Sequence, residues 1–336
     1  MGMGGILATG TPELFRAAVL RAAEVLRRGQ AVALPTETVY GLAANALDAS
    51  AVERIFELKG RPAHNPIIVH VANLEMGRAC VSSWPPLAGK LAKAFWPGPL
   101  TLVLPRASAI PPVVTAGGPT VGIRWPSHPF IQAVILECGF PLAAPSANPS
   151  NRVSPTSASH VRRYFGNRIP LIVDGGPSRI GLESTVLDIS VSPPRLLRPG
   201  MIHAPALLAV TGQLQTTGTP GANVLKSPGQ LPRHYSPKAK LVLWSWRDEE
   251  DLVRQSRRAP VQQSCIHVIA HTRVPAQGRF GRLAVLPHDA HAFARGLYAE
   301  LHRSDEVGAH LIVVETPPDL PEWQAVRDRL NRASRD

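Results

Sequence analysis

The chain lacks the features that mark membrane, secreted and zinc-binding proteins. Its three cysteines, Cys80, Cys138 and Cys265, are scattered along 336 residues without metal-ligand spacing, so we expect reduced, buried thiols. No run approaches the roughly 18 apolar residues of a membrane span, and residues 1–10 lack the basic region and long apolar core of a signal peptide. These absences predict an ordinary soluble protein that works in the cytoplasm and has no membrane partner.

Positive charge, in contrast, is abundant and unevenly placed. The formal net charge is +12, and residues 240–336 hold 14 Lys or Arg against 13 Asp or Glu, so a net charge of +11 belongs to residues 1–239. A basic surface concentrates nucleoside triphosphates and can attract RNA through counterion release. A general arginine bias of the proteome would produce the same excess, so a weak tRNA contact stays open.

The length of the chain allows two domains that each bury a core of their own. Residues 212–237 contain eight Gly or Pro and show no sustained hydrophobic periodicity, which predicts a linker. We therefore divide the chain into a larger domain (residues 1–208), a linker that can act as a lid (209–238) and a small α/β domain (239–336).

Residues 1–208 alternate between strand-like and helix-like segments. Thr11 as N-cap, Pro12 at the first helical position and Gly29 as a stop predict a helix over residues 12–28. Short apolar runs predict strands at residues 31–35, 67–71, 100–104, 120–124, 142–144, 171–173 and 185–189. Helices separate these strands irregularly, so we expect an α/β domain with one twisted mixed sheet, flanking helices and a concave site at the strand ends.

Residues 239–336 show a more regular alternation. Strands are expected at residues 241–243, 266–270, 283–286 and 311–314, with helical stretches near 248–257, 290–303 and 322–332. This order predicts a smaller, Rossmann-like parallel α/β domain. The region contains no G-x-G-x-x-G and no P-loop motif, so its shape does not imply a bound dinucleotide.

The most informative residues are Lys59-Gly60-Arg61 and, far downstream, Ser146-Ala147-Asn148. Two fixed cations with short hydroxyl and amide groups suit a site that holds a polyphosphate together with a nucleoside. A capping-box spacing at Ser50 and apolar residues at helical intervals predict a helix over residues 51–59 that ends at Gly60. A solvated helix terminus, where the macrodipole favours cations, would also explain this basic pair.

A dense series of short motifs accompanies these residues in a fixed order. The motifs are Leu34-Pro35-Thr36-Glu37-Thr38-Val39-Tyr40-Gly41-Leu42, Lys59-Gly60-Arg61-Pro62, Asn65-Pro66-Ile67-Ile68-Val69-His70, Phe95-Trp96-Pro97-Gly98-Pro99-Leu100-Thr101, Val121-Gly122-Ile123-Arg124, Ala144-Pro145-Ser146-Ala147-Asn148, Asp174-Gly175-Gly176, Glu183-Ser184-Thr185-Val186 and Leu197-Arg198-Pro199-Gly200. Over residues 10–205 this series resembles the YrdC-like family of L-threonylcarbamoyladenylate synthases. Ser227-Pro228-Gly229 and His234-Tyr235-Ser236-Pro237 resemble the two-domain form of that family.

The resemblance implies a reaction that condenses L-threonine, bicarbonate or CO2, and ATP into L-threonylcarbamoyladenylate and pyrophosphate. Downstream tRNA threonylcarbamoyl transferase proteins would then move the threonylcarbamoyl group to an adenosine beside the anticodon. Positioning and charge neutralisation should carry the rate, as in other displacements at phosphorus. Mg²⁺ is expected with ATP but without a named protein ligand, because no carboxylate cluster in the sequence resembles a magnesium cage.

Five residues are assigned to the ATP site by the resemblance. Lys59 and Arg61 are the expected catalytic residues, since each would neutralise charge on the bound triphosphate. Arg198 would add a third cation, whose planar guanidinium suits bidentate contact with phosphate. Ser146 and Asn148 would fix the nucleotide.

Three further residues are ATP-binding candidates, and two of them have plain structural alternatives. Thr115 lies in Val114-Thr115-Ala116-Gly117. Ser154, directly before a proline, could contact a phosphate or the ribose from a helix N-terminus, or could be an ordinary N-cap. Tyr235 could be carried by the linker over bound nucleotide and exclude water, or could pack against the second domain.

The remaining candidates form the expected L-threonine site. Arg124 would pair with the threonine carboxylate, while Thr36, His70 and Ser184 would bind its hydroxyl, amine or carbamate. His70 at a strand end could equally be a structural histidine. Tyr40 could simply close the core beneath the turn.

Two other functions fit parts of this pattern. A related carbamoyl-transfer enzyme is one, because YrdC-like domains also occur in hydrogenase-maturation carbamoyltransferases. Those proteins carry acylphosphatase and zinc-finger segments, whereas this chain has no paired C-x-x-C motifs. An RNA-binding module that uses a basic concave face is the other, and it would need no threonine site.

Overall fold

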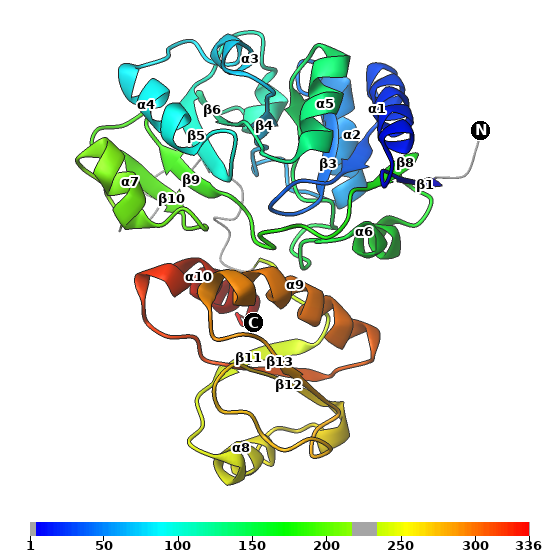
Figure 1. Cartoon of the computed structure of the whole chain (residues 1–336), viewed down its shortest axis with the longest axis vertical. Helices are drawn as coiled ribbons and strands as arrows, with labels where there is room; N and C mark the ends of the chain where they lie inside the picture. The colour runs from blue at the N-terminus through cyan, green and yellow to red at the C-terminus, as the bar shows by residue number, and fades with distance from the viewer. Residues whose placement is uncertain (1–4, 217–233, 336) are drawn as a thin grey trace. The chain divides into compact units, whose positions relative to one another are not determined.

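The computed structural model describes residues 5–216 and 234–335, which group into two compact units (Figure 1). The first unit comprises Met1–Ser150 and Ser154–Leu231, and the second comprises Asn151–Val153 and Pro232–Asp336. Most of the predicted linker and lid falls on residues 217–233, which lie outside the described residues. Helix α7 (Ala204–Thr211) runs through residue 208, the predicted end of the larger domain.

Within residues 5–216 the chain forms a 10-stranded mixed sheet. Its strands lie in the order β1-β8-β2-β3-β7-β4-β6-β5-β9-β10, with both parallel and antiparallel neighbours. The strands are β1 (Gly5–Ala8), β2 (Val32–Leu34), β3 (Gly41–Asn45), β4 (Val69–His70), β5 (Leu100–Pro105), β6 (Thr120–Arg124), β7 (Leu142–Ala143), β8 (Leu171–Asp174), β9 (Thr185–Asp188) and β10 (Arg195–Arg198). The predicted twisted mixed α/β architecture is confirmed, and β1, β3 and β10 are strands that the sequence pattern did not predict.

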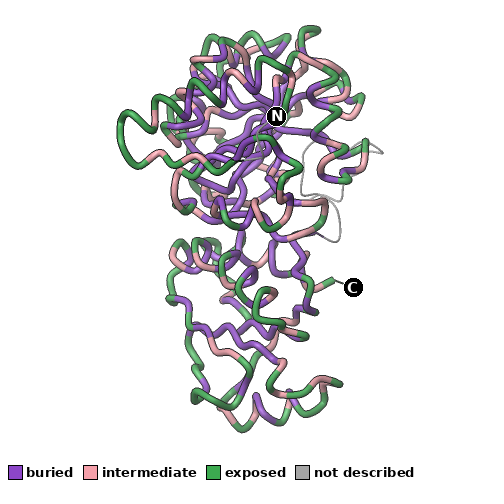
Figure 2. The backbone as a smooth tube through the Cα atoms, turned by 90° about the vertical axis from the view of Figure 1, so that its right-hand side faces the viewer, coloured by how far each residue is buried: buried purple, intermediate pink, exposed green. Residues whose placement is uncertain are grey.

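Helices pack on both faces of this sheet because successive strand side chains point to opposite sides. In β2, Val32 and Leu34 join one apolar core with α1 and α5, while Ala33 joins the other core with α2, α4 and α6. The helices are α1 (Pro12–Arg27), α2 (Ala49–Lys59), α3 (Leu74–Ala79), α4 (Pro86–Phe95), α5 (Pro129–Cys138) and α6 (Ala158–Phe165), with a short 3-10 turn η1 at Pro112–Thr115. Figure 2 shows the buried backbone running through these layers, with exposed residues on the outer turns and loops.

Local sequence signals explain where the first two helices begin and end. Thr11 caps α1 by accepting a hydrogen bond from the Leu14 amide, as predicted. The predicted capping role of Ser50 is wrong, because α2 begins earlier and Asp48 is its N-cap. Gly60 ends α2 in the left-handed conformation, as expected for a helix C-terminus.

The second unit is a separate parallel α/β structure. Its 4-stranded sheet has the order β11-β14-β12-β13, and all neighbours are parallel. In Figure 1, α9 and α10 cover one face of this sheet and α8 lies on the other. Its elements are β11 (Lys240–Trp244), α8 (Glu249–Ser256), η2 (Gln263–Cys265), β12 (Ile266–Ala270), β13 (Arg282–Val285), α9 (Ala290–Glu306), β14 (Leu311–Glu315), η3 (Pro321–Trp323) and α10 (Gln324–Ala333). The predicted small parallel α/β fold is confirmed.

The expected cysteine and membrane features can be compared with this structure. All three cysteines are free thiols. Cys80 and Cys138 are buried, and burial raises the pKa of Cys80 to about 12 and that of Cys138 to about 11. Cys265 is only partly buried, which corrects that part of the prediction. Across residues 5–216 and 234–335, every helix is too short or too polar to cross a bilayer.

Two glycines from the motif loops should respond differently to alanine. A Cβ at Gly200 would lie 2.4 Å from the backbone N of Thr185, whereas Gly60 has open space and only an unfavourable φ of +57°. Gly200→Ala should therefore lower the free energy of unfolding by more than about 2 kcal/mol. Gly60→Ala should cost about 1 kcal/mol. Urea denaturation of both variants checks this, and equal losses would show that the Gly200 loop adapts to a side chain.

Candidate active site

Strand direction brings several predicted residues to one edge of the large sheet. Strands β4, β6 and β10 run one way, and the intervening β5 and β9 run the other way. His70, Arg124 and Arg198 are the last residues of β4, β6 and β10. The same edge therefore carries the beginnings of β5 and β9. Thr101 is the second residue of β5, and Ser184 directly precedes β9. Residues far apart in sequence meet here because the sheet alternates direction.

Arg124 is the best-connected cation at this edge. Its guanidinium lies 2.7 Å from Glu37 Oε1, and both side chains are buried. Its Nη1 also donates to the Thr38 hydroxyl at 2.9 Å, and its Nε donates to the carbonyl of Gly98 at 3.2 Å. His70 is its register partner on the neighbouring strand β4. These contacts hold the guanidinium in one place against three different segments of the chain.

Burial and neighbouring charge set the protonation of this cluster. Burial alone would raise the pKa of the Glu37 carboxyl, but the Arg124 guanidinium and the Ser127 amide bring that pKa below its ordinary value. Burial and the Arg124 charge lower the pKa of His70 to about 3, although Glu37 opposes the shift. Glu37 is therefore ionised and His70 is a neutral imidazole at physiological pH.

Thr36 stands in a tight turn directly after β2. Its hydroxyl lies 2.9 Å from the Thr38 hydroxyl and donates to the carbonyl of Val39 at 2.6 Å. The Thr36 carbonyl accepts from the Ser178 hydroxyl, so a distant loop clamps the turn. Through Thr38 the turn reaches Arg124, which places Thr36 in the same cluster.

Ser184 and Arg198 form a second connected group. Arg198 donates from Nη2 to the Ser184 hydroxyl at 3.1 Å and from Nε to the Ser184 carbonyl at 3.0 Å. The Ser184 hydroxyl also lies 2.8 Å from the hydroxyl of Thr101. Directly before Ser184, the Glu183 carboxylate accepts a hydrogen bond from Ser154 at 2.6 Å. Ser154 thus bonds a side chain rather than capping a helix.

Lys59 connects the segment Lys59-Gly60-Arg61 to the distant segment Ser146-Ala147-Asn148. Its Nζ donates to the carbonyls of Ser146 at 2.6 Å and Asn148 at 2.5 Å. The side chain is only 3% exposed, so the alternative of a solvated helix terminus is wrong. Burial, followed by the Arg61 charge, lowers the pKa of Lys59 well below its ordinary value.

Arg61 and Thr115 are held by neighbouring loops. Arg61 donates to the side-chain oxygen of Asn65 and to the carbonyl of Pro66, each at 2.7 Å, and it is buried. The Thr115 hydroxyl donates to the Gly118 carbonyl at 2.8 Å. The amide of Ile67 bonds the carbonyl of Val114, which brings the two loops side by side. These backbone bonds connect two candidates that are 54 residues apart in sequence.

Both tyrosine candidates pack in the way that their structural alternatives describe. Tyr40 is fully buried, and its hydroxyl donates to the Gly176 carbonyl at 2.7 Å. Tyr235 is buried within the second unit, where its ring stacks on Tyr298 at a centroid distance of 6.1 Å and lies 5.2 Å below the Arg329 guanidinium. Contact between Tyr235 and ATP stays a prediction.

The sequence interpretation missed four polar residues that complete these clusters. Glu37 and Thr38 hold Arg124, Thr101 bonds Ser184, and Glu183 bonds Ser154. Each of the four stands in one of the sequence motifs. Each also lies within two residues of another polar motif residue or of the start of a strand. A polar residue inside a dense motif was the available signal, but the motif does not reveal which side chain points to which partner.

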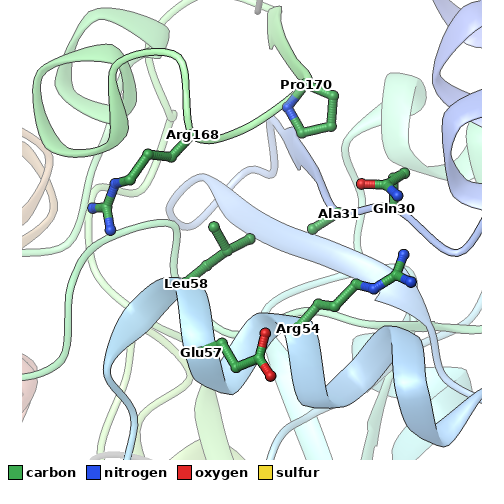
Figure 3. A pocket seen from close by; sticks show the side chains of 7 residues that line it. All are labelled: Gln30, Ala31, Arg54, Glu57, Leu58, Arg168 and Pro170. Carbon is green, nitrogen blue, oxygen red and sulfur yellow. The ribbon is translucent and has the colours of Figure 1, made fainter.

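The hollow shown in Figure 3 lies elsewhere on the first unit. It has a volume of about 370 Å³, and Arg54, Glu57 and Arg168 are among its polar lining residues. None of the predicted site residues lines it. Within residues 5–216 and 234–335, no three His, Cys, Asp or Glu side chains are grouped so as to hold a metal ion.

Comparison with known proteins gives a consistent picture over the whole chain. Residues 24–200 match the Sua5–YciO–YrdC family model, described as telomere recombination, and residues 202–335 match the model of the threonylcarbamoyl-AMP synthase C-terminal domain. The threonylcarbamoyl-AMP synthases of Pyrococcus abyssi and Bacillus subtilis are each 41% identical, over 93% and 98% of this chain and 93% and 94% of their own lengths. The crystal structure of P. abyssi Sua5 complexed with L-threonine is similar with a TM-score of 0.89 at 39% identity, covering 99% of this chain and 98% of that one.

The low pKa of His70 predicts how stability depends on pH. The unfolded chain binds a proton at His70 near pH 6.5, whereas the folded protein does so only near pH 3, so stability must fall as the pH drops through this window. Between pH 7.5 and pH 5 the loss attributable to His70 should be about 2 kcal/mol. Urea denaturation should therefore show a shallower pH dependence for His70→Gln than for the natural protein. Equal pH slopes would mean that His70 has the same pKa in the folded protein as in the unfolded chain.

Proposed function

Because this chain belongs to the Sua5–YciO–YrdC family and matches threonylcarbamoyl-AMP synthases over nearly its full length, we propose that it is an L-threonylcarbamoyladenylate synthase. It condenses L-threonine, bicarbonate or CO2, and ATP into L-threonylcarbamoyl-AMP and pyrophosphate. The supporting observation is the buried polar edge of the large sheet, where cations, hydroxyls and a neutral imidazole gather. This edge offers separate partners for a triphosphate and for an amino acid.

Lys59, Arg61 and Arg198 serve the triphosphate. All three are buried, and a cation in a dry site stabilises phosphate charge far more than one in water. Lys59 Nζ is bonded only to backbone carbonyls in the described residues, so its charge is available to a ligand. Charge neutralisation on the β- and γ-phosphates makes pyrophosphate a better leaving group.

Further polar residues fix the nucleotide. Ser146 and Asn148 lie on the loop that Lys59 anchors, and their side chains hold the nucleoside. Ser154 and Thr115 contribute hydroxyls from adjoining loops. Tyr235 is carried by the linker and covers the nucleotide when the linker closes as a lid. Water exclusion of this kind protects a labile adenylate.

The amino-acid site lies around Arg124. Its guanidinium takes the threonine carboxylate, because a planar fork matches a carboxylate in a bidentate manner. Thr36, His70 and Ser184 bind the hydroxyl, amine or carbamate of the substrate. His70 is suited to this role because a neutral imidazole accepts or donates a hydrogen bond without adding charge.

The reaction needs positioning more than covalent catalysis. The threonine amine, once deprotonated, attacks CO2 to form a carbamate, and a carbamate oxygen then attacks the α-phosphorus as pyrophosphate leaves on the opposite side. Mg²⁺ accompanies ATP and lowers the charge of the phosphates. Phosphate oxygens and water would supply most of its ligands.

The product leaves for downstream tRNA threonylcarbamoyl transferase proteins, so the enzyme works in the cytoplasm with ATP, L-threonine and bicarbonate or CO2. The net charge of +11 on residues 1–239 supports ATP attraction and permits a weak tRNA contact. The division into a catalytic domain, a linker and a small α/β domain belongs to the same proposal. A related carbamoyl-transfer enzyme and an RNA-binding module fit less well, because the chain spans nearly the full length of threonylcarbamoyl-AMP synthases.

Pyrophosphate release tests the proposed function directly. The assay contains ATP, Mg²⁺, L-threonine and bicarbonate, and each component is omitted in turn. Release should require all of them, and the adenylate should form in equal amount. Release that persists without threonine, or intact RNA binding without any release, would overturn the proposal.

The low pKa of Lys59 predicts proton uptake when ATP binds. In the free protein burial and then the Arg61 charge lower this pKa, and a triphosphate beside Nζ opposes both, so the pKa of Lys59 should be higher in the complex than in the free protein. Calorimetric titration with ATP in two buffers of different ionisation enthalpy should therefore give different apparent enthalpies. Lys59→Met, which keeps the length but cannot titrate, should remove the difference. Identical enthalpies for the natural protein in both buffers would contradict the prediction.

A further inference from the structure

One buried carboxylate oxygen at the candidate site has no partner. Glu37 Oε1 contacts the Arg124 guanidinium at 2.7 Å and accepts from the Ser127 amide at 3.0 Å. Glu37 Oε2 is buried but accepts no hydrogen bond from the described residues. A buried oxygen of an ionised carboxylate is costly to leave unsatisfied. Such an atom in a binding site calls for a donor that arrives with the ligand.

The surroundings of Glu37 select the kind of donor. Arg124 already places one positive charge on this carboxylate, and no group of three metal-ligating side chains exists in residues 5–216 and 234–335. Both facts disfavour a divalent cation. A single ammonium or amine requires only one accepting oxygen, so it leaves the ion pair between Glu37 and Arg124 in place. Nδ1 of His70 is also buried, has no hydrogen-bond partner among the residues that the structure describes, and belongs to the same electrostatic cluster.

We infer that Glu37 binds the amine of the amino-acid substrate through Oε2, while Arg124 binds its carboxylate. The inference rests on the proposed function and deepens it. An α-amino acid is a zwitterion, with an ammonium and a carboxylate on the same carbon. The buried Glu37–Arg124 pair offers one charge of each sign, 2.7 Å apart, so binding adds no net charge to a dry site. This pair selects α-amino acids over hydroxy acids or amines.

Binding measurements can isolate the contact between Glu37 and the amine. The probes are L-threonine and (R)-3-hydroxybutyrate, which is threonine without its amine. Their affinities are measured by calorimetry or competition for the natural protein and for Glu37→Gln, in the absence of ATP. The natural protein should prefer threonine by about 10- to 100-fold, and Glu37→Gln should lose most of that preference. Affinity for 3-hydroxybutyrate should be kept or should rise, because Glu37→Gln leaves the Arg124 guanidinium without its counter-charge.

Three outcomes would overturn the inference. Equal weakening of both probes by Glu37→Gln would mean that Glu37 only positions Arg124. An unchanged preference for threonine would place the amine elsewhere. A raised Mg²⁺ requirement for pyrophosphate release, with normal threonine affinity, would make Glu37 a metal ligand. Failure of the natural protein to bind threonine at all would instead count against the proposed function.

Control variants protect the experiment against simple unfolding. Asp188→Asn removes another buried carboxylate, which lies at the end of β9 and bonds Ser190, and it should keep the full preference for threonine. If Glu37→Gln does not fold, Glu37→Asp serves instead, because it retains the charge but retracts the carboxylate by one methylene group. It should still reduce the preference, and an unchanged preference would count against the inference.

Discussion

The buried ion pair between Glu37 and Arg124 organises the candidate site. Glu37 lies in the turn after β2, and Arg124 ends β6. Around the pair, the Ser127 amide, the Thr38 hydroxyl and the Gly98 carbonyl supply further hydrogen bonds from three segments. Loss of one member of such a pair costs about 3–5 kcal/mol, because the other charge stays buried. The pair thus fixes the loops around the candidate site and keeps a polar centre inside a dry structure.

A second constraint is the burial of Lys59, whose ammonium group contacts backbone carbonyls and no carboxylate among the described residues. Lys59 is surrounded by backbone carbonyls, and its lowered pKa records the cost of that position. A protein that keeps such groups buried loses stability unless a ligand restores the missing charge. Under the proposed function, ATP supplies negative charge beside Lys59. The arrangement that destabilises the free site would then favour the triphosphate and the charged transition state.

In the second unit, a side chain of the protein itself occupies a strand-end position of the kind that binds phosphate in many parallel α/β folds. At the carboxyl end of β12, the amides of His271, Thr272 and Arg273 all donate to the carboxylate of Glu315, the last residue of β14. Parallel α/β sheets commonly bind phosphates at this edge, through successive backbone amides. Here an internal carboxylate takes those donors. This agrees with the absence of a glycine-rich phosphate motif in residues 239–336.

Sequence alone determined the architecture of both sheets. Short apolar runs and the Thr11 and Gly60 helix signals predicted a mixed sheet and a parallel second sheet, because these signals are local. The two groups of candidate substrate residues came instead from the resemblance of the motif series to a known family, and they stay predictions. Only the tertiary structure decided which of these side chains are buried and which partners they bond. Lys59 bonds residues 87 and 89 positions away, and Arg124 bonds Thr38 across 86 positions. No local pattern encodes such contacts, since they depend on how strands of opposite direction meet at one edge of the sheet. For the same reason Glu37 was visible as a motif residue, but its ion pair and its unpartnered oxygen were not.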